Sequence, residues 1–106
     1  MARALVKISP HPKRGEVIEI KTLISHEMET GFRHTNTGVA IPRDIITTFV
    51  ATYNGEEIFS AQLFPAIAAN PFITFYTIAT ESGTLEFRWS GDNGYAASEQ
   101  VKIAVE

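Results

Sequence analysis

The sequence predicts an all-β fold, an immunoglobulin-like antiparallel β-sandwich of about seven strands. Short runs rich in Val, Ile, Thr and Phe are separated by Gly, Pro, Asn and Asp. These runs recur at about 8 to 12 residues, which is the spacing of strands in a sandwich or barrel. Helix signals are weak by comparison, and a chain of 106 residues is one domain of ordinary size. We therefore expect residues 1–106 to form a single domain.

Alternation of apolar and polar residues places the strands in chain order. The clearest example is Thr84–Ser90, in which Leu85, Phe87 and Trp89 occupy one face and charged residues the other. The run Glu16–Ile24 likewise puts three isoleucines and a threonine on a single face. The predicted strands are Leu5–Ile8, which we expect at an edge, Glu16–Ile24, Ile46–Tyr53, Glu57–Leu63, Phe72–Ile78, Thr84–Ser90 and a last strand that includes Val101–Val105.

Two turns carry an Asn-Gly pair, which tolerates the positive φ angles of tight hairpin turns. The pair Asn54–Gly55 lies between the third and fourth predicted strands. The turn Asp92–Gly94 lies between the last two. We expect each turn to close a β-hairpin.

Two connections differ from ordinary sandwich turns. Ser25–Asp44 has about 20 residues, more than the roughly 12 to 15 beyond which an unstructured loop is uncommon and often functional. Phe64–Phe72 has the sequence FPAIAANPF, which is apolar where such turns are usually polar, and Pro65 and Pro71 stiffen its two ends. This second connection either packs under the sandwich or faces a partner.

Composition excludes several classes of function. The net charge is −3 and the nine Lys and Arg residues are dispersed, so the basic patch that nucleic acids require is missing. The absence of cysteine excludes disulfides, thiol nucleophiles and Cys-containing metal sites. No run approaches the roughly 18 apolar residues of a membrane span, and the first residues lack the apolar segment of a secretory signal. Composition alone therefore predicts a cytoplasmic protein with no nucleic acid or membrane partner and no cofactor.

No pair of residues forms a convincing catalytic pattern. Ser25 and His26 suggest a nucleophile and its base, but neighbours on a strand point to opposite faces, and the Gly-x-Ser-x-Gly elbow is absent. His26 and Glu27 begin the zinc protease pattern His-Glu-x-x-His, but Thr30 and not a histidine follows three residues later. We expect no catalytic residue.

Metal and carboxylate sites are equally weak. His11, His26 and His34 could supply imidazole ligands, but their spacing matches no known ligand pattern, and solvated or capping histidines are the expectation. Glu56 and Glu57 are adjacent beside a turn, whereas a glycosidase places its two carboxyl groups about 5 to 10 Å apart across a cleft. We therefore predict no metal site and a solvated turn.

Apolar residues in the two unusual connections suggest that the chain binds a partner protein. Trp89 shares its phase with the core residues of its strand, which argues against a sugar-stacking surface. Met and aromatic side chains are enriched in the buried centres of interfaces, whereas arginines could form ion pairs at a rim or orient an anionic group. The alternative is that the apolar residues seal the ends of the sandwich and that the arginines are solvated. The candidate interface residues are Met28, Phe32, Arg33, Arg43, Ile67 and Phe72.

Several motifs in order resemble the SoxZ family, the small subunits of the SoxYZ carriers of bacterial thiosulfate oxidation. They are ISHEMETGFR at Ile24–Arg33, IPRDII at Ile41–Ile46, PAIAANPF at Pro65–Phe72, ESGTLEFRW at Glu81–Trp89 and the turn Asp92–Gly94. The resemblance covers nearly the whole chain. It departs from the family pattern at 34–37, where more charged residues are expected.

The resemblance implies a β-sandwich that forms a heterodimer with SoxY, whose C-terminal Gly-Gly-Cys-Gly-Gly arm carries the sulfur intermediates covalently. It implies no catalytic residue in this chain, and transient contacts with other Sox enzymes through the SoxYZ complex. It also implies a periplasmic location, reached by export with a signal-bearing partner, in place of the cytoplasm. The alternatives are a carbohydrate or other small-ligand module and a sulfur-transferring enzyme.

Overall fold

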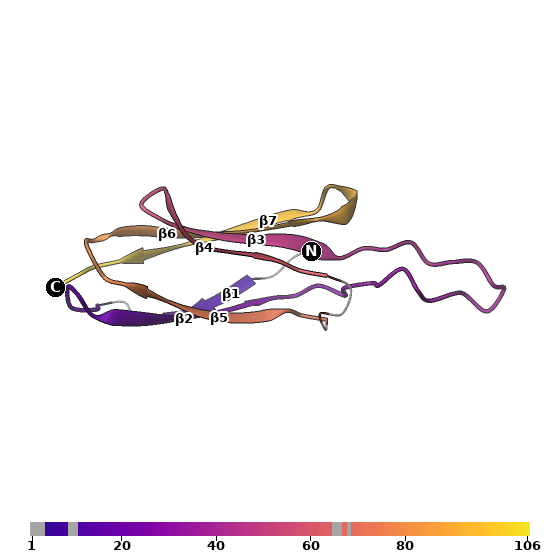
Figure 1. The fold of residues 1–106 in the computed structure, drawn as a ribbon, viewed down its shortest axis with the longest axis horizontal. Helices are drawn as coiled ribbons and strands as arrows, with labels where there is room; N and C mark the ends of the chain where they lie inside the picture. Colours follow the sequence, from indigo (N-terminus) through magenta and orange to yellow (C-terminus); the bar gives the residue numbers. More distant parts are fainter. Residues whose placement is uncertain (1–3, 9–10, 65–66, 68) are drawn as a thin grey trace.

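Seven β-strands form two antiparallel sheets in the part of the chain that the computed structural model describes, residues 4–8, 11–64, 67 and 69–106 (Figure 1). The sheets have the strand orders β1-β2-β5 and β4-β3-β6-β7 and pack face to face. The predicted immunoglobulin-like sandwich is confirmed. The strands are β1 (Ala4–Lys7), β2 (Val17–Ile24), β3 (Ile46–Tyr53), β4 (Glu56–Gln62), β5 (Phe72–Ile78), β6 (Gly83–Gly91) and β7 (Ala96–Ile103).

Aromatic side chains from both sheets fill the core. The ring of Phe49 on β3 lies 5.2 Å from that of Trp89, measured between centroids, and 5.9 Å from that of Phe75 on the opposite sheet. Trp89 is 1% exposed, so the prediction that it is a core residue is confirmed and no sugar can stack on it. Each such buried aromatic side chain contributes about 1.5 to 3 kcal/mol through removal of its apolar surface from water.

Strand β2 shows how alternation sets the orientation of the sheet. Its predicted core face, which carries three isoleucines and Thr22, is buried along its whole length. The hydroxyl of Thr22 donates to the carbonyl of Ile73 at 3.0 Å, which satisfies the one polar group on that face.

Both predicted hairpins are present. Asn54 and Gly55 adopt φ angles of 50° and 83° between β3 and β4, as a tight turn with positive φ requires. A 3-10 turn, η1 (Asp92–Gly94), joins β6 to β7. Strand β7 begins earlier than the sequence predicts, because Ser90 and Ala96 already pair across this short turn. The predicted edge strand near the N-terminus is confirmed as β1, one residue closer to the N-terminus.

The two unusual connections lie at the same end of the sandwich. The first runs outward from β2 and returns to β3 as a long extended arm, seen at the right of Figure 1. We call residues 25–45 the arm. In the second connection Phe64 and Ile67 are exposed, whereas residues 65, 66 and 68, including the predicted stiffening by Pro65, lie outside the described residues.

Tyr53 closes the opposite end of the sandwich. Its hydroxyl accepts hydrogen bonds from the backbone N–H groups of Thr80 (3.3 Å) and Glu81 (3.1 Å). The same hydroxyl donates to the carbonyl oxygen of Glu81. One buried side chain on β3 therefore fixes the path of the chain from β5 to β6.

We predict that Tyr53→Phe lowers the free energy of unfolding by about 1 to 2 kcal/mol, because two partly buried hydrogen bonds from backbone N–H groups lose their acceptor. Urea denaturation followed by tryptophan fluorescence measures this change. The matched control is Tyr76→Phe, which removes an exposed hydroxyl bonded to Glu19 and should change stability by less than about 0.5 kcal/mol. Equal effects of the two substitutions would contradict the role assigned to Tyr53.

Candidate functional site

The arm is a two-stranded extension with its own backbone hydrogen bonds. At its base Glu29 and Asp44 exchange both backbone bonds, each 2.8 Å long. Farther out the N–H of Ile41 donates to the carbonyl of Arg33 at 2.9 Å, and at the tip the N–H of Thr35 donates to Val39. The arm gives the molecule its length, since the principal extents are 60, 21 and 20 Å.

His26 joins the arm to the apolar connection. Its backbone N–H donates to the side-chain oxygen of Asn70 at 3.0 Å, and the N–H of Asn70 donates back to its carbonyl at 2.7 Å. Nδ1 of its ring accepts the N–H of Met28 at 2.9 Å, and the ring packs edge-on against Tyr95. With one ring nitrogen and both backbone groups in use, His26 serves as a structural hub. No hydrogen bond between described residues joins it to Ser25.

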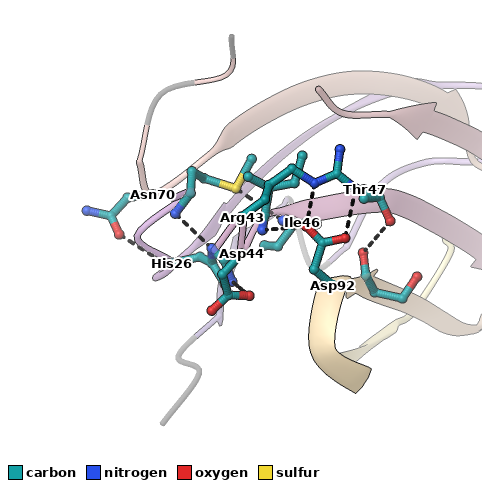
Figure 2. A network of polar contacts seen from close by, with 10 residues as sticks. His26, Arg43, Asp44, Ile46, Thr47, Asn70 and Asp92 are labelled. Carbon is teal, nitrogen blue, oxygen red and sulfur yellow. Dashed lines mark hydrogen bonds and ion pairs between the residues drawn. The ribbon is translucent and has the colours of Figure 1, made fainter. Parts of the chain in front are cut away.

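The structure shows that Met28 is not an exposed contact residue. Its side chain is 4% exposed, and its sulfur lies 3.3 Å from the N–H of Ile46 (Figure 2). A φ angle of 54° at Met28, which non-glycine residues rarely adopt, turns the side chain toward the core. The expectation that Met28 is exposed is therefore wrong, because its side chain is part of the core of the free chain.

Asp92 in the η1 turn fastens the returning strand of the arm to the sandwich (Figure 2). Its two carboxylate oxygens accept Nε and Nη2 of Arg43 at 2.8 and 2.9 Å. One of them also accepts the N–H of Ile45 at 3.2 Å, while the N–H of Asp92 donates to the carbonyl of Ile45 at 3.0 Å. Gly91 makes this approach possible, because a Cβ at that position would lie 2.2 Å from the carbonyl oxygen of Ile45.

Ion pairing lowers the pKa of two carboxyl groups along the arm. The Arg43 guanidinium and then the N–H of Ile45 hold the pKa of Asp92 below its ordinary value. The pKa of Glu29 is lowered chiefly by its hydrogen bonds with Arg33, whose Nε lies 3.0 Å from Oε2. Both arginines proposed for a rim are therefore already paired within the chain, although their side chains stay about half exposed or more.

The remaining predicted contact residues are exposed. Phe32 lies on the arm and is 77% exposed. Phe72 opens β5, two residues after Asn70, and Ile67 lies in the preceding connection. The structure thus brings Arg43 and Met28 together at the base of the arm, leaves Phe32 and Arg33 farther along it, and places Phe72 beside the base.

Sequence reasoning missed the structural roles of Asn70 and Asp92. Asn70 bonds a residue 44 positions away, and Asp92 bonds Arg43 across 49 positions, so no local pattern could connect them. It also missed exposed Phe64 and Val39. The run FPAIAANPF was the one available signal, because it showed that this end of the molecule is apolar.

A shallow hollow of about 470 Å³ lies beside the base of the arm. It is polar, and the hydroxyl of Tyr95 is buried there with no hydrogen-bond partner among the described residues. Within the described residues no three His, Cys, Asp or Glu side chains come close enough to hold a metal ion. That part of the chain also has no helix long and apolar enough to cross a bilayer. The hollow is lined by Ser25, His26, Glu27, Asp44, Ala69, Asn70 and Tyr95.

The family described as "Sulphur oxidation protein SoxZ" matches residues 6–102, which include the arm, its base and all but the ends of the sandwich. The chain belongs to the SoxZ family. This places it in the Sox sulfur-oxidation system, which implies a Sox partner in general terms. Among curated proteins none matches its sequence.

The fold of this SoxZ-family chain is similar to that of solved structures from outside the family. A superoxide reductase (neelaredoxin) from Ignicoccus hospitalis aligns with a TM-score of 0.75 at 14% identity, covering 97% of this chain and 80% of its own. A Thermotoga maritima protein thought to be a superoxide reductase aligns with a TM-score of 0.70 at 14% identity, covering 97% and 85%. At this identity the likeness shows a shared fold alone.

We predict that Gly31→Ala loosens the base of the SoxZ-family arm. The added Cβ would lie 2.9 Å from Cβ of Arg43, and the φ angle of +88° already disfavours a side chain. Amide exchange at Glu29 and Asp44 should accelerate about tenfold, equivalent to about 1.4 kcal/mol. The matched control is Gly38→Ala, with a φ of +83° and nothing within 4 Å of the added Cβ. Equal exchange in both variants would contradict the predicted clash.

We also predict that acid releases the arm from the η1 turn. Because the pKa of Asp92 is lower in the folded chain, its stabilisation is complete above the ordinary pKa of about 3.9 and is lost as the pH falls below it. Protection of the Ile45 amide, corrected for intrinsic exchange, should stay constant from about pH 7 to 5 and fall below about pH 4. Asp92→Asn should show weaker protection without this step. A variant with an unchanged pH profile would show that another group controls the arm.

Proposed function

We propose that this chain is a non-catalytic scaffold that binds SoxY and helps to present its C-terminal cysteine arm to the Sox enzymes. The observation that carries the proposal is the SoxZ family match over residues 6–102. In this role the stable partner is SoxY. Other Sox enzymes carry out the reaction steps and contact this chain transiently through the SoxYZ complex.

The chemistry of the chain supports a scaffold role. It has no cysteine, so the covalent sulfur intermediates must be carried by another subunit. A thiol on the scaffold could attack a persulfide or a thiosulfonate on the carrier by exchange and form a dead-end disulfide. A surface without cysteine avoids that reaction. With this function we propose a periplasmic location, reached by export together with a partner that bears the signal.

The exposed apolar side chains at the arm end support a protein partner. Phe32 and Phe72 are more than half exposed, and Ile67 is 41% exposed. Aromatic residues in such positions are typical anchors of protein interfaces once a partner removes them from water. We assign these three residues, with the rim arginines Arg33 and Arg43, to the contact with SoxY or its enzymes. Met28 contributes indirectly, because its buried side chain packs at the base of the arm and stabilises it.

Coexpression with SoxY tests the proposal. A tagged copy of this chain should retain SoxY through affinity and size-exclusion chromatography as a one-to-one complex. With thiosulfate and the Sox enzymes, intact-mass measurement should show added sulfur on SoxY and none on this chain, which has no thiol to accept it. Failure to retain SoxY would refute the scaffold role, and a covalent mass increase on this chain would favour a sulfur-transferring enzyme.

A further inference from the structure

The outer face of the β1-β2-β5 sheet exposes an unusual number of apolar side chains, although one face of an antiparallel sheet in water is usually polar. Five large apolar side chains on this face are between 54% and 62% exposed. They are more than half of the nine that the described residues leave exposed, and they alternate with inward-facing core residues. These side chains are Leu5, Val17, Phe72, Tyr76 and Ile78.

Strand register gathers four of these five residues into two rows and places Tyr76 between the rows, opposite Glu19. Leu5 pairs with Leu23, and Leu23 pairs with Phe72, which gives an apolar row across all three strands at the arm end. Val17 pairs with Ile78 and gives a second row at the far end of β2. We call the surface made by these rows and the residues between them the small-sheet face.

The outer face of the larger sheet has the opposite character. Strands β6 and β7 present charged and polar side chains there, and Glu86 binds both Arg88 (2.8 Å) and Gln100 (3.0 Å). Thr48 and Thr52 continue this polar surface on β3. The larger sheet is therefore an ordinary solvated face, in contrast to the small sheet.

We propose that the small-sheet face is the surface on which the folded part of SoxY docks. This inference rests on the proposed function and adds to it the surface and the chemistry of the contact. The matching surface of SoxY is apolar and carries carboxylate groups.

The charges between the two rows favour a different chain over a second copy. Lys7 and Lys21 are direct register partners on this face, and like charges opposite one another destabilise a sheet. Oε1 of Glu19 lies 3.4 Å from Nζ of Lys21, so the carboxylate offsets one of the two positive charges. A symmetric dimer would bring this net positive strip against itself. Carboxylates from another protein would instead complete the pairing.

The size of the face also requires a protein surface that extends past the sheet. Eight residues of β2 at about 3.3 Å each and three strands about 4.8 Å apart give a face of roughly 26 by 14 Å, or about 370 Å². A stable complex buries about 800 Å² on each partner, twice as much. Phe72 leads from the face to Asn70 and the base of the arm, so the same partner can cover both.

Binding measurements on variants test the proposal. Val17→Asp and Phe72→Asp each place a carboxylate in one apolar row, and each should weaken SoxY binding at least about tenfold, as buried unpaired charge requires. Lys7→Glu and Lys21→Glu should slow association, with a smaller effect at high salt. The matched controls are Ala96→Asp and Ser98→Asp, which add the same charge to exposed positions on β7 and should leave binding unchanged.

Each outcome of these measurements decides the proposal. If the wild-type chain binds SoxY and all aspartate variants bind it equally well, the assignment of the contact to the small-sheet face is refuted. The scaffold role then remains intact. A wild-type chain that does not bind SoxY would overturn both. A wild-type chain that forms a stable homodimer through this face, which SoxY does not displace, would assign the face to a second copy and overturn the proposal.

Footprinting of the unaltered complex gives a second measurement that does not depend on variants folding. Hydroxyl radicals oxidise exposed aromatic side chains, so Phe72 and Tyr76 should be oxidised in the free chain and protected when SoxY is added. Unchanged oxidation of both residues in a complex shown to be intact would place the contact elsewhere.

Discussion

The carboxylate of Asp92 is the contact on which the arm depends. It holds the guanidinium of Arg43 and the N–H of Ile45 at once, and Gly91 lets the two backbones approach closely enough for this. The β6-β7 turn thus fixes the direction in which the arm leaves the sandwich. A charge-assisted bidentate pair is stronger and more directional than a neutral hydrogen bond. It can therefore hold the arm in one orientation.

The scaffold function proposed for this chain requires surface and no reactive group. The sandwich supplies two outer faces, of which one is polar and the other apolar, and both the arm and the apolar connection leave from the same end. Superoxide reductases share the fold, so the fold by itself does not determine function. In this SoxZ-family chain the exposed apolar residues are concentrated on one sheet face and at the arm end.

Much of the fold followed from local pattern, whereas the base of the arm did not. Alternation located Trp89 and the inward face of β2, and Asn-Gly turns located both hairpins. Met28 was expected to be exposed because it lies in a long connection, whereas its positive φ turns the side chain into the core. Asn70 and His26 lie 44 residues apart with two strands between them, so their mutual hydrogen bonds could not be inferred before those strands were placed.

The sequence by itself determined the sandwich, its strands and the family, because alternation, turn residues and motif order are properties of neighbouring residues. Only the tertiary structure decided that residues 25–45 project as an arm and that β5 leaves one apolar face uncovered. Strand β5 is apolar on both sides, so its sequence cannot tell which side meets the other sheet. That choice is made by its register with β2, a contact between segments about 50 residues apart.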